Sequence, residues 1–574
     1  MGRAALARAR AARARPRGGE SAVARSRRGR GRDRAADARR RRRRVHGAHA
    51  APLGPQPLGV AAPGPLRPLL PSAREDGVGG QPARPRGSPL LDDRGPGVSE
   101  APGSAAPPPA ESDPPARAAS AAAAVALAPI VPLGIWQLAW PAILTNLLTS
   151  LVGFVDTKIV GSLGAPAVAA VTTGSRIYFV LQALLIAVTA GTTALVARAW
   201  GGGDRAEAER VTKASLGLCT AIALVVSVPA FALPHALAGV FRLEPGTIDL
   251  AAEFIRWLAP FQIAFAVHFA LGSALRAAGD TRTPLAIGAF TNVLNIGLVY
   301  GLVYGRFGLP ALGVKGAAIA SGIAFTAGAL ALVLLWWRGL LVLQVGPPDV
   351  WERPRVRRIL DIGYPAGLEQ LVWQVGFLAF LWIVSLYGTA PYAAYGIGVA
   401  ILAFSFLVGW GFSIAASTLV GQHLGAGDPE GAVRSGWRAL RGALAAQAAF
   451  GLAIVLAAEP LARFMIDDPE VVRLTVVFIY ILGSVQPLMA IEYAMGGALR
   501  GAGDTRFPLF AVACGLLGAR VTLAALFAWR GLSVEWIFAA LIGDYVVKAI
   551  LLTYRYRTGR WKTVLAARTV QTPS

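Results

Sequence analysis

From about residue 128 onward, long apolar stretches alternate with short polar turns along the chain. A helix rises 1.5 Å per residue, so a stretch of about 20 residues crosses the ~30 Å hydrocarbon layer of a membrane. The pattern predicts spans near 133–160, 170–199, 211–233, 248–277, 283–305 and 311–337, and then near 357–385, 391–423, 433–457, 471–500, 507–529 and 532–555. We therefore expect an all-α polytopic membrane protein with twelve transmembrane helices.

The last six predicted spans repeat the first six. The segment ALRAAGDTRTPL at 274–285 recurs as ALRGAGDTRFPL at 498–509, with ten of twelve residues identical. Matching positions lie 224 residues apart in four pairs: Pro141 and Pro365, Gly164 and Gly388, Asp204 and Asp428, and Asp280 and Asp504. One ungapped register over this distance indicates an internal duplication.

The duplication predicts two pseudo-symmetric six-helix lobes. Six spans is an even number, so both copies enter the membrane from the same side, and a cavity is expected between them. The predicted parts are an extension over 1–127, an N-lobe over 128–340, a cytoplasmic linker over 341–356, a C-lobe over 357–557 and a cytoplasmic tail over 558–574. Arginine and lysine gather in the even-numbered turns, which by the positive-inside rule places both termini in the cytoplasm.

The repeated turn between the fourth and fifth spans of each copy has the residues of a capped hairpin. Gly279 and Gly503 suit the left-handed residue that ends a helix, and an aspartate or threonine follows to cap the next helix. The four arginines of the two turns suit phosphate headgroups: Arg276, Arg282, Arg500 and Arg506. We expect a structural role for these residues.

Composition supports a membrane protein, since 55% of the residues are hydrophobic, 15% are charged and the mean hydropathy is +0.52. The first 50 residues are different, because they hold 18 arginines and only three acids. Such a segment buries no core and is expected to be disordered. A polybasic arm for anionic lipid or nucleic acid, a transit peptide and a mispredicted start all fit it, and we favour the last.

Several segments together resemble the multidrug and toxic compound extrusion (MATE) family. They are PAILTNLLTSLVGFVDT, PAGLEQLVWQVGFLAF, GGGDRAEAERV, GAGDPEGAVRS, both ALR turns and FGLPALGVKGAAIAS. The likeness covers roughly 130–557, and among bacterial members it is similar to the DinF-like subgroup. The resemblance implies a V-shaped pair of lobes that exports cationic, amphipathic drugs or metabolites in exchange for protons or sodium.

The N-lobe holds the expected ion-coupling residues. An ionisable side chain inside a span costs about 2.5–3.5 kcal/mol on insertion scales, so Asp156 needs a functional or structural reason. The resemblance implies that the aspartate of VDT is the coupling acid and that Asn295 is its fifth-span partner. Asn292 and Ser321 complete the expected set, whereas Val299 stands where members carry Asp or Asn. Without that oxygen we favour a proton over sodium; a pairing of Asp156 with Lys158 is the structural alternative.

The C-lobe offers the expected substrate or second cation site. Glu369 has only Thr145 at its N-lobe counterpart, and Glu492 corresponds to His268 at the offset of 224. Uncharged polar groups in the spans include Gln182 and Gln486. Structural alternatives are a headgroup-level Glu369, a Glu492 paired with an arginine and a packed His268. Aromatic residues that could contact an organic cation are Tyr178, Tyr300, Trp373, Trp382 and Trp410.

The sequence lacks the motifs of an enzyme or a nucleotide-driven pump. It holds no GxxxxGK[ST] loop and no HExxH or CxxC pattern, and its two cysteines are isolated. We expect no cofactor, no metal site and no catalytic residues. The expected partners are small organic cations and the bilayer of the inner or plasma membrane, with no nucleic acid, and the expected state is a monomer.

A lipid-linked oligosaccharide flippase is the alternative function. Its cavity should carry cationic side chains to hold pyrophosphate. The charges inside the predicted spans are mainly Asp156, Glu369 and Glu492, and this interpretation favours a cation exporter.

Overall fold

The computed structural model describes residues 134–345 and 352–565, and all the regular elements within these ranges are helices. Twelve of the helices or continuous helix groups in this part of the chain are long and apolar enough to cross a membrane. The predicted all-α fold with twelve spans is therefore confirmed. The predicted extension over 1–127 lies outside the described residues.

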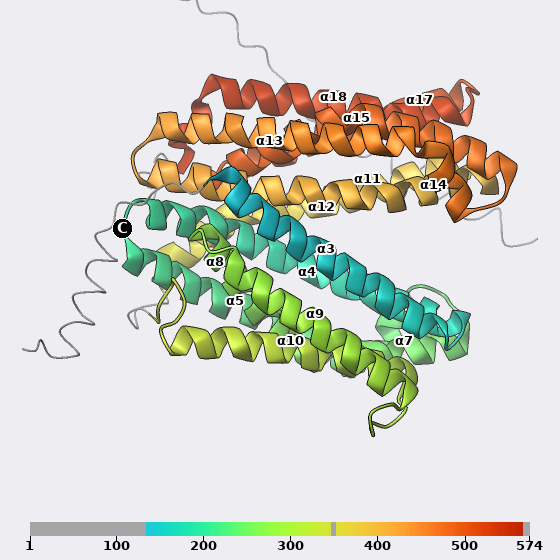
Figure 1. The fold of residues 1–574 in the computed structure, drawn as a ribbon, viewed down its shortest axis with the longest axis horizontal. Helices are drawn as coiled ribbons and strands as arrows, with labels where there is room; N and C mark the ends of the chain where they lie inside the picture. The colour runs from blue at the N-terminus through green and yellow to red at the C-terminus, as the bar shows by residue number, and fades with distance from the viewer. Residues whose placement is uncertain (1–133, 346–351, 566–574) are drawn as a thin grey trace, which may run out of the picture. The chain divides into compact units, whose positions relative to one another are not determined.

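The first six spans form the N-lobe, drawn from blue to yellow-green in Figure 1. Its helices are α3 (Ile135–Gly161), α4 (Ala165–Gly201), α5 (Arg205–Ala232), α6 (Pro234–Gly239), α7 (Pro245–Leu258), η2 (Ala259–Phe261), α8 (Gln262–Ala277), α9 (Arg282–Tyr304) and α10 (Gly313–Trp337). The fourth span consists of α7, η2 and α8, which run on without a break from Pro245 to Ala277.

The last six spans form the C-lobe, drawn from yellow to red. Its helices are α11 (Arg353–Ser385), α12 (Thr389–Gly425), α13 (Pro429–Leu456), α14 (Ala458–Met465), α15 (Pro469–Gly501), α16 (Arg506–Val512), η3 (Ala513–Val521), α17 (Thr522–Trp529), α18 (Val534–Thr558) and η4 (Arg560–Thr563). The eleventh span is not one regular helix, since η3 is a π-helical stretch between α16 and α17. Such stretches are rare and often lie at functional sites.

The repeated turn between the fourth and fifth spans has the expected backbone conformation in both lobes, but its aspartates have different partners. Gly279 and Gly503 both have positive φ angles, of 96° and 83°. Asp280 accepts hydrogen bonds from the backbone N–H groups of Arg282 and Thr283 and so caps α9. Asp504 instead accepts a 2.8 Å bond from Nε of Arg555 on α18. The equivalent aspartates of the repeated turn thus differ: Asp280 caps a helix in one lobe, and Asp504 is half of an ion pair in the other.

The turn between the second and third spans is also repeated, and here both copies agree. The Asp204 side chain accepts from the backbone N–H of Glu207 at the start of α5, and that of Asp428 accepts from Gly431 at the start of α13. The Gly431 hydrogen bond, with the nearby His423 and Arg434 in support, lowers the pKa of Asp428. Each aspartate therefore caps the helix that follows it.

The lobes contact each other through α3 and α4 of the N-lobe and α11 and α12 of the C-lobe. The approach is closest at the ends of α4 and α12, where a Cβ atom on Gly201 would lie 1.9 Å from the carbonyl oxygen of Gln422. Gln422 also donates through Nε2 to the carbonyl oxygen of Ala277 at 2.9 Å. Thr418 donates to the carbonyl oxygen of Arg276 at 3.1 Å. Glycine at position 201 permits this backbone-to-backbone contact between the lobes.

Candidate functional site

Asp156 on α3 and Asn295 on α9 meet inside the N-lobe. Nδ2 of Asn295 donates to Oδ2 of Asp156 at 2.8 Å. The other carboxylate oxygen, Oδ1 of Asp156, is buried without a hydrogen-bond donor among the described residues, and so is Oδ1 of Asn295. Buried polar atoms are normally paired, so two unpaired acceptors in one contact call for an explanation. A proton bound by Asp156 would supply the donor that this pair of acceptors lacks.

The other two residues of the predicted coupling set line a cavity. Asn292 on α9 and Ser321 on α10 both border a space of about 600 Å³ lined mainly by the N-lobe, hereafter the N-lobe cavity, and Asp156 is absent from the described residues around it. Val299 is fully buried in an apolar cluster with Ile159 and Val303. Of the predicted coupling residues, Asn295 therefore contacts Asp156, whereas Asn292 and Ser321 lie at the cavity wall.

The N-lobe cavity combines amides, hydroxyls and aromatic rings. Gln182, Gln262, His268 and Asn292 supply polar groups, and Arg276 also borders the space. Its aromatic lining is Tyr178, Phe179, Phe261, Phe265, Phe269, Phe325 and, from the C-lobe helix α12, Trp410. Such a wall of apolar rings with a few polar groups is typical of a site for an amphipathic small molecule.

Of the five aromatic residues considered from the sequence, two border this cavity. They are Tyr178, whose hydroxyl donates to the Ile255 carbonyl oxygen, and Trp410. Tyr300 and Trp382 are exposed, and Trp373 stacks on Phe377 with ring centroids 5.5 Å apart.

A second, smaller cavity of about 130 Å³ lies between the lobes. Hydroxyl groups of Thr189, Thr193, Ser273, Ser413 and Ser417 border it, together with Gln370 and Trp410. Arg276, Glu369 and Arg500 are its charged residues. Arg276 and Trp410 border both cavities, so the two spaces share part of their lining.

Glu369 is paired inside the protein. Its Oε1 lies 2.6 Å from Nη2 of Arg500 on α15, and its Oε2 lies 3.4 Å from Nε of the same arginine. Arg500, the first arginine of the C-lobe turn, thus contacts a carboxylate between the lobes. The expectation that Arg276 and Arg500 serve lipid headgroups is wrong, because both border the inter-lobe cavity.

Glu492 belongs to a buried charge cluster within the C-lobe. Nζ of Lys548 lies 3.3 Å from Oε1 of Glu492 and 3.0 Å from Oδ1 of Asp544. Arg520, on the π-helical stretch η3, lies 3.8 Å from Asp544 and donates to the Tyr395 hydroxyl at 3.1 Å. His268, the counterpart of Glu492, lines the N-lobe cavity instead. The two residues therefore have different surroundings.

Sequence reasoning missed Arg520, Asp544 and Lys548, although each is a charge within an apolar stretch. Arg276 and Arg500 lie inside the ends of the predicted spans, as they do in the structure, but their position beside the inter-lobe cavity was not expected. The expectation that acids dominate the buried charges is therefore wrong, because these four basic residues accompany Asp156, Glu369, Glu492 and Asp544.

Gln486 lies in a hydrogen-bonded group in the C-lobe core. Its Oε1 and that of Gln447 are both contacted by the Ser405 hydroxyl, and all three residues are fully buried. Gln486 therefore joins α12, α13 and α15, whereas Gln182 faces the N-lobe cavity.

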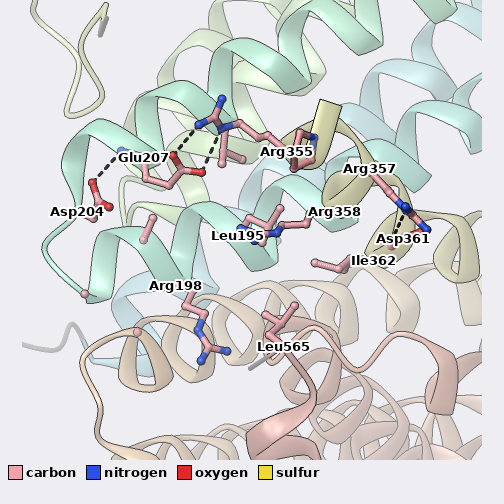
Figure 2. A pocket seen from close by; sticks show the side chains of 15 residues that line it. Leu195, Arg198, Asp204, Glu207, Arg355, Arg357, Arg358, Asp361, Ile362 and Leu565 are labelled. Atoms are coloured by element: carbon pink, nitrogen blue, oxygen red, sulfur yellow. Dashed lines mark hydrogen bonds and ion pairs between the residues drawn. The ribbon is translucent and has the colours of Figure 1, made fainter. Parts of the chain in front are cut away.

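A third cavity, of about 310 Å³, lies where α4 and α5 meet the start of α11. Figure 2 shows Arg355 reaching across to Glu207, with an Nη2–Oε2 distance of 3.0 Å. Arg198, Arg358 and Leu565 also border the space. The ion pair links the two lobes at the end of the protein where their backbones approach most closely.

No group of three or more metal-binding side chains was found in the described part of the chain. The candidate site in these ranges has three parts: the acid–amide pair of Asp156 and Asn295, the aromatic N-lobe cavity, and the inter-lobe cavity with its three charged side chains.

Comparisons with known proteins agree with this arrangement. The family profile MatE matches residues 141–300 and 365–526, one match in each lobe. The probable multidrug resistance protein NorM of Thermotoga maritima is 32% identical over 437 residues, covering 74% of this chain and 92% of that protein. The uncharacterized transporter YisQ of Bacillus subtilis is 23% identical, covering 74% and 94%.

Solved structures share the fold. A transporter of the MOP superfamily from Pyrococcus furiosus superposes with a TM-score of 0.70 at 20% identity, covering 75% of this chain and 96% of that one. The bent form of the Vibrio cholerae MATE transporter VcmN gives 0.69 at 21% identity, covering 75% and 97%.

Proposed function

The chain belongs to the multidrug and toxic compound extrusion (MATE) family of efflux transporters, and from this premise we propose that it is a proton-coupled antiporter. It exports amphipathic organic molecules that carry a cationic group, by alternating access. The observation that carries this proposal is the partly buried pair of Asp156 and Asn295, with its unpaired oxygens; Asn292, on the same helix as Asn295, borders the aromatic cavity.

Asp156 is the coupling group in this mechanism. As an anion it accepts from Asn295 and keeps α3 and α9 in one arrangement, with negative charge inside the N-lobe. A bound proton cancels this charge and turns one acceptor into a donor, which changes the hydrogen bonds between the two helices. Substrate with a cationic group is held better by the charged form and is released when the proton binds. The inward proton gradient then drives export.

The proposed orientation follows from the charges at the lobe junction. Arg198, Arg355, Arg357 and Arg358 border the cavity where α4 and α5 meet α11. The positive-inside rule assigns this end to the cytoplasm, with both termini on that side of the inner or plasma membrane. Because the lobes are in closest contact there, we assign this conformation to a state closed to the cytoplasm.

Sodium is the less favoured coupling ion. A sodium site needs about five or six oxygen ligands. Val299, which lies in an apolar cluster, supplies no oxygen at the position where the resemblance implies Asp or Asn in family members. A proton needs only the Asp156 carboxylate and its Asn295 partner.

The test uses purified protein in sodium-free liposomes with an imposed pH gradient. The wild type should export the fluorescent cation tetramethylrhodamine methyl ester, and an uncoupler should stop it. Asp156→Asn keeps the size and polarity of the side chain but cannot exchange a proton, so gradient-driven export should fall to the level of empty liposomes. Asp249→Asn is the matched control, because Asp249 is an exposed acid paired with His235. Equal export by Asp156→Asn and the wild type would refute the assignment.

The flippase remains the second candidate, because Arg276 and Arg500 provide basic side chains in the inter-lobe cavity. Glu369 already pairs with one of them, which leaves too little positive charge for a pyrophosphate. Flipping of a lipid-linked oligosaccharide in the same liposomes, without dye export, would favour this alternative.

A further inference from the structure

The duplication places one arginine of each lobe in the cavity between the lobes. Arg276 and Arg500 are equivalent residues of the repeated turn, 224 positions apart, and both border the inter-lobe space. Both side chains lie back along their helices, beside Gly272 and Gly496 respectively. The backbone thus presents the two guanidinium groups in similar ways, and a difference between them must come from their neighbours.

The neighbours differ by one carboxylate. Arg500 contacts Glu369 at 2.6 Å and lies 3.5 Å from the Ser413 hydroxyl. The position equivalent to Glu369 in the N-lobe is Thr145, which borders the N-lobe cavity together with Arg276. The Thr145 hydroxyl donates to the carbonyl oxygen of Pro141 within its own helix. Within residues 134–345 and 352–565, the Arg276 side chain forms no ion pair with an acid.

The charges around the two cavities therefore do not cancel. Their charged side chains are Arg276, Arg500 and Glu369, which leaves one positive charge when His268 is neutral. An organic cation without an acidic group would meet an uncompensated positive charge in a partly desolvated space. A guanidinium group presents two parallel donors that match a carboxylate.

We propose that Arg276 is a substrate-binding residue that accepts a carboxylate, so that the preferred substrates are amphipathic zwitterions with an aromatic ring system, a cationic group and a carboxylate. This inference rests on the proposed transport function and narrows its substrate class. The substrate carboxylate takes the place that Glu369 occupies beside Arg500. The rings lie against the aromatic lining, which includes Trp410 next to both cavities.

Two dyes that differ in one group test the proposal. Tetramethylrhodamine acid is a zwitterion, and its methyl ester is a cation with the same rings. Binding to the purified protein in lipid nanodiscs is measured by fluorescence anisotropy. The wild type should bind the acid about tenfold more tightly than the ester. Arg276→Gln should remove this preference by weakening acid binding and leave ester binding unchanged or stronger.

Three further variants separate recognition from folding. Arg276→Lys keeps the charge and should retain part of the preference. Thr145→Glu places an acid where Glu369 stands in the other lobe, so it should neutralise Arg276 and favour the ester. Arg282→Gln changes an exposed arginine six residues further on and should behave as the wild type. Thermal unfolding of each variant identifies any loss of structure.

The outcomes also distinguish this inference from the proposed function. Equal binding of acid and ester by the wild type, or an unchanged preference in both Arg276→Gln and Thr145→Glu, would overturn the inference. Gradient-driven export of the ester in those same proteins would leave the antiport mechanism intact. Conversely, an Arg276-dependent acid preference without gradient-driven export of either dye would support the binding site and contradict the antiporter.

Discussion

The two lobes have the same helices but use charge in different ways. In the C-lobe, the buried charged groups are in contact with opposite charges: Glu369 with Arg500, and Glu492 and Asp544 with Lys548. In the N-lobe, the described residues give Asp156 an amide partner, Asn295, and give the Arg276 side chain no ion pair with an acid. The C-lobe position equivalent to Asp156 is Phe380, which is fully buried in an apolar cluster.

This difference separates charges that hold the structure from charges that are available for transport. A buried ion pair contributes little net stability, but loss of one partner leaves the other charge uncompensated and costs about 3–5 kcal/mol. A buried charge without a counter-charge lowers the stability of the folded protein, and a bound proton or an oppositely charged substrate group relieves this destabilisation. We therefore assign the stabilising role to the C-lobe charges and the transport chemistry to the N-lobe.

The largest expected effect concerns Lys548, which lies between two acids in the C-lobe. Lys548→Met leaves Glu492 and Asp544 without their shared cation, and we expect a loss of about 3–5 kcal/mol in unfolding free energy. Reversible unfolding in mixed micelles measures this loss. Lys158→Met, at an exposed position on α3, is the control and should change little. An equal loss of stability in both variants would contradict the stabilising role assigned to the C-lobe charges.

The next effect concerns the Glu369–Arg500 pair. Glu369→Gln and Arg500→Gln should each destabilise the protein by about 2–3 kcal/mol, a little less than the Lys548 change because the pair borders a cavity. The double variant should be more stable than the sum of the two changes predicts. Strict additivity in this double-mutant cycle would show that the two side chains do not act as a pair.

A smaller effect is expected at the closest contact between the lobes. Gly201→Ala places a methyl group against the Gln422 carbonyl, so the lobes must separate locally, at a cost of about 1–3 kcal/mol. We expect faster alkylation of a cysteine introduced at Ala199, which borders the lobe junction. Gly246→Ala has open space around its Cβ and should leave the rate unchanged. A similar increase in both variants would argue against a tight contact at Gly201.

The smallest effect on stability is expected at the pair of Asp156 and Asn295. Asn295→Ala removes the one side chain that donates to Asp156 within residues 134–345 and 352–565, yet both residues already have an unpaired oxygen. We expect less than about 1 kcal/mol of destabilisation, but a severalfold loss of gradient-driven export. A large loss of stability with normal export per folded molecule would assign Asn295 a structural role.

The architecture could be predicted from the sequence because span length and duplication are properties of the chain itself. Twelve apolar stretches and a register of 224 residues are sufficient to predict two six-helix lobes. Asp156 was noticeable as an acid within a long apolar stretch, and family resemblance indicated Asn295. These two residues are 139 positions apart in the sequence, and the structure shows that their side chains meet.

The charge pairs could not be predicted in this way. Whether Glu369 meets Arg500, 131 residues further on, depends on which helix faces turn toward each other, and hydropathy averages over all faces of a helix. Lys548 and Asp544 are four residues apart on one helix, yet the averaged hydropathy of that span conceals both. The π-helical stretch that carries Arg520 lies within an apolar span whose hydropathy is typical of a regular helix. Arg276 likewise has nearly the same sequence surroundings as Arg500, and only the three-dimensional contact of Arg500 with Glu369 distinguishes the two arginines.

The most direct test of the central claim is a measurement of proton release when substrate binds. Purified protein in weakly buffered, sodium-free solution is mixed with saturating tetramethylrhodamine methyl ester, and a pH-indicator dye reports protons released per protein. We predict release of up to one proton by the wild type and by Asp249→Asn, and none by Asp156→Asn at matched dye occupancy. Equal proton release by Asp156→Asn and the wild type would contradict the account, because the exchanged proton would then belong to another residue.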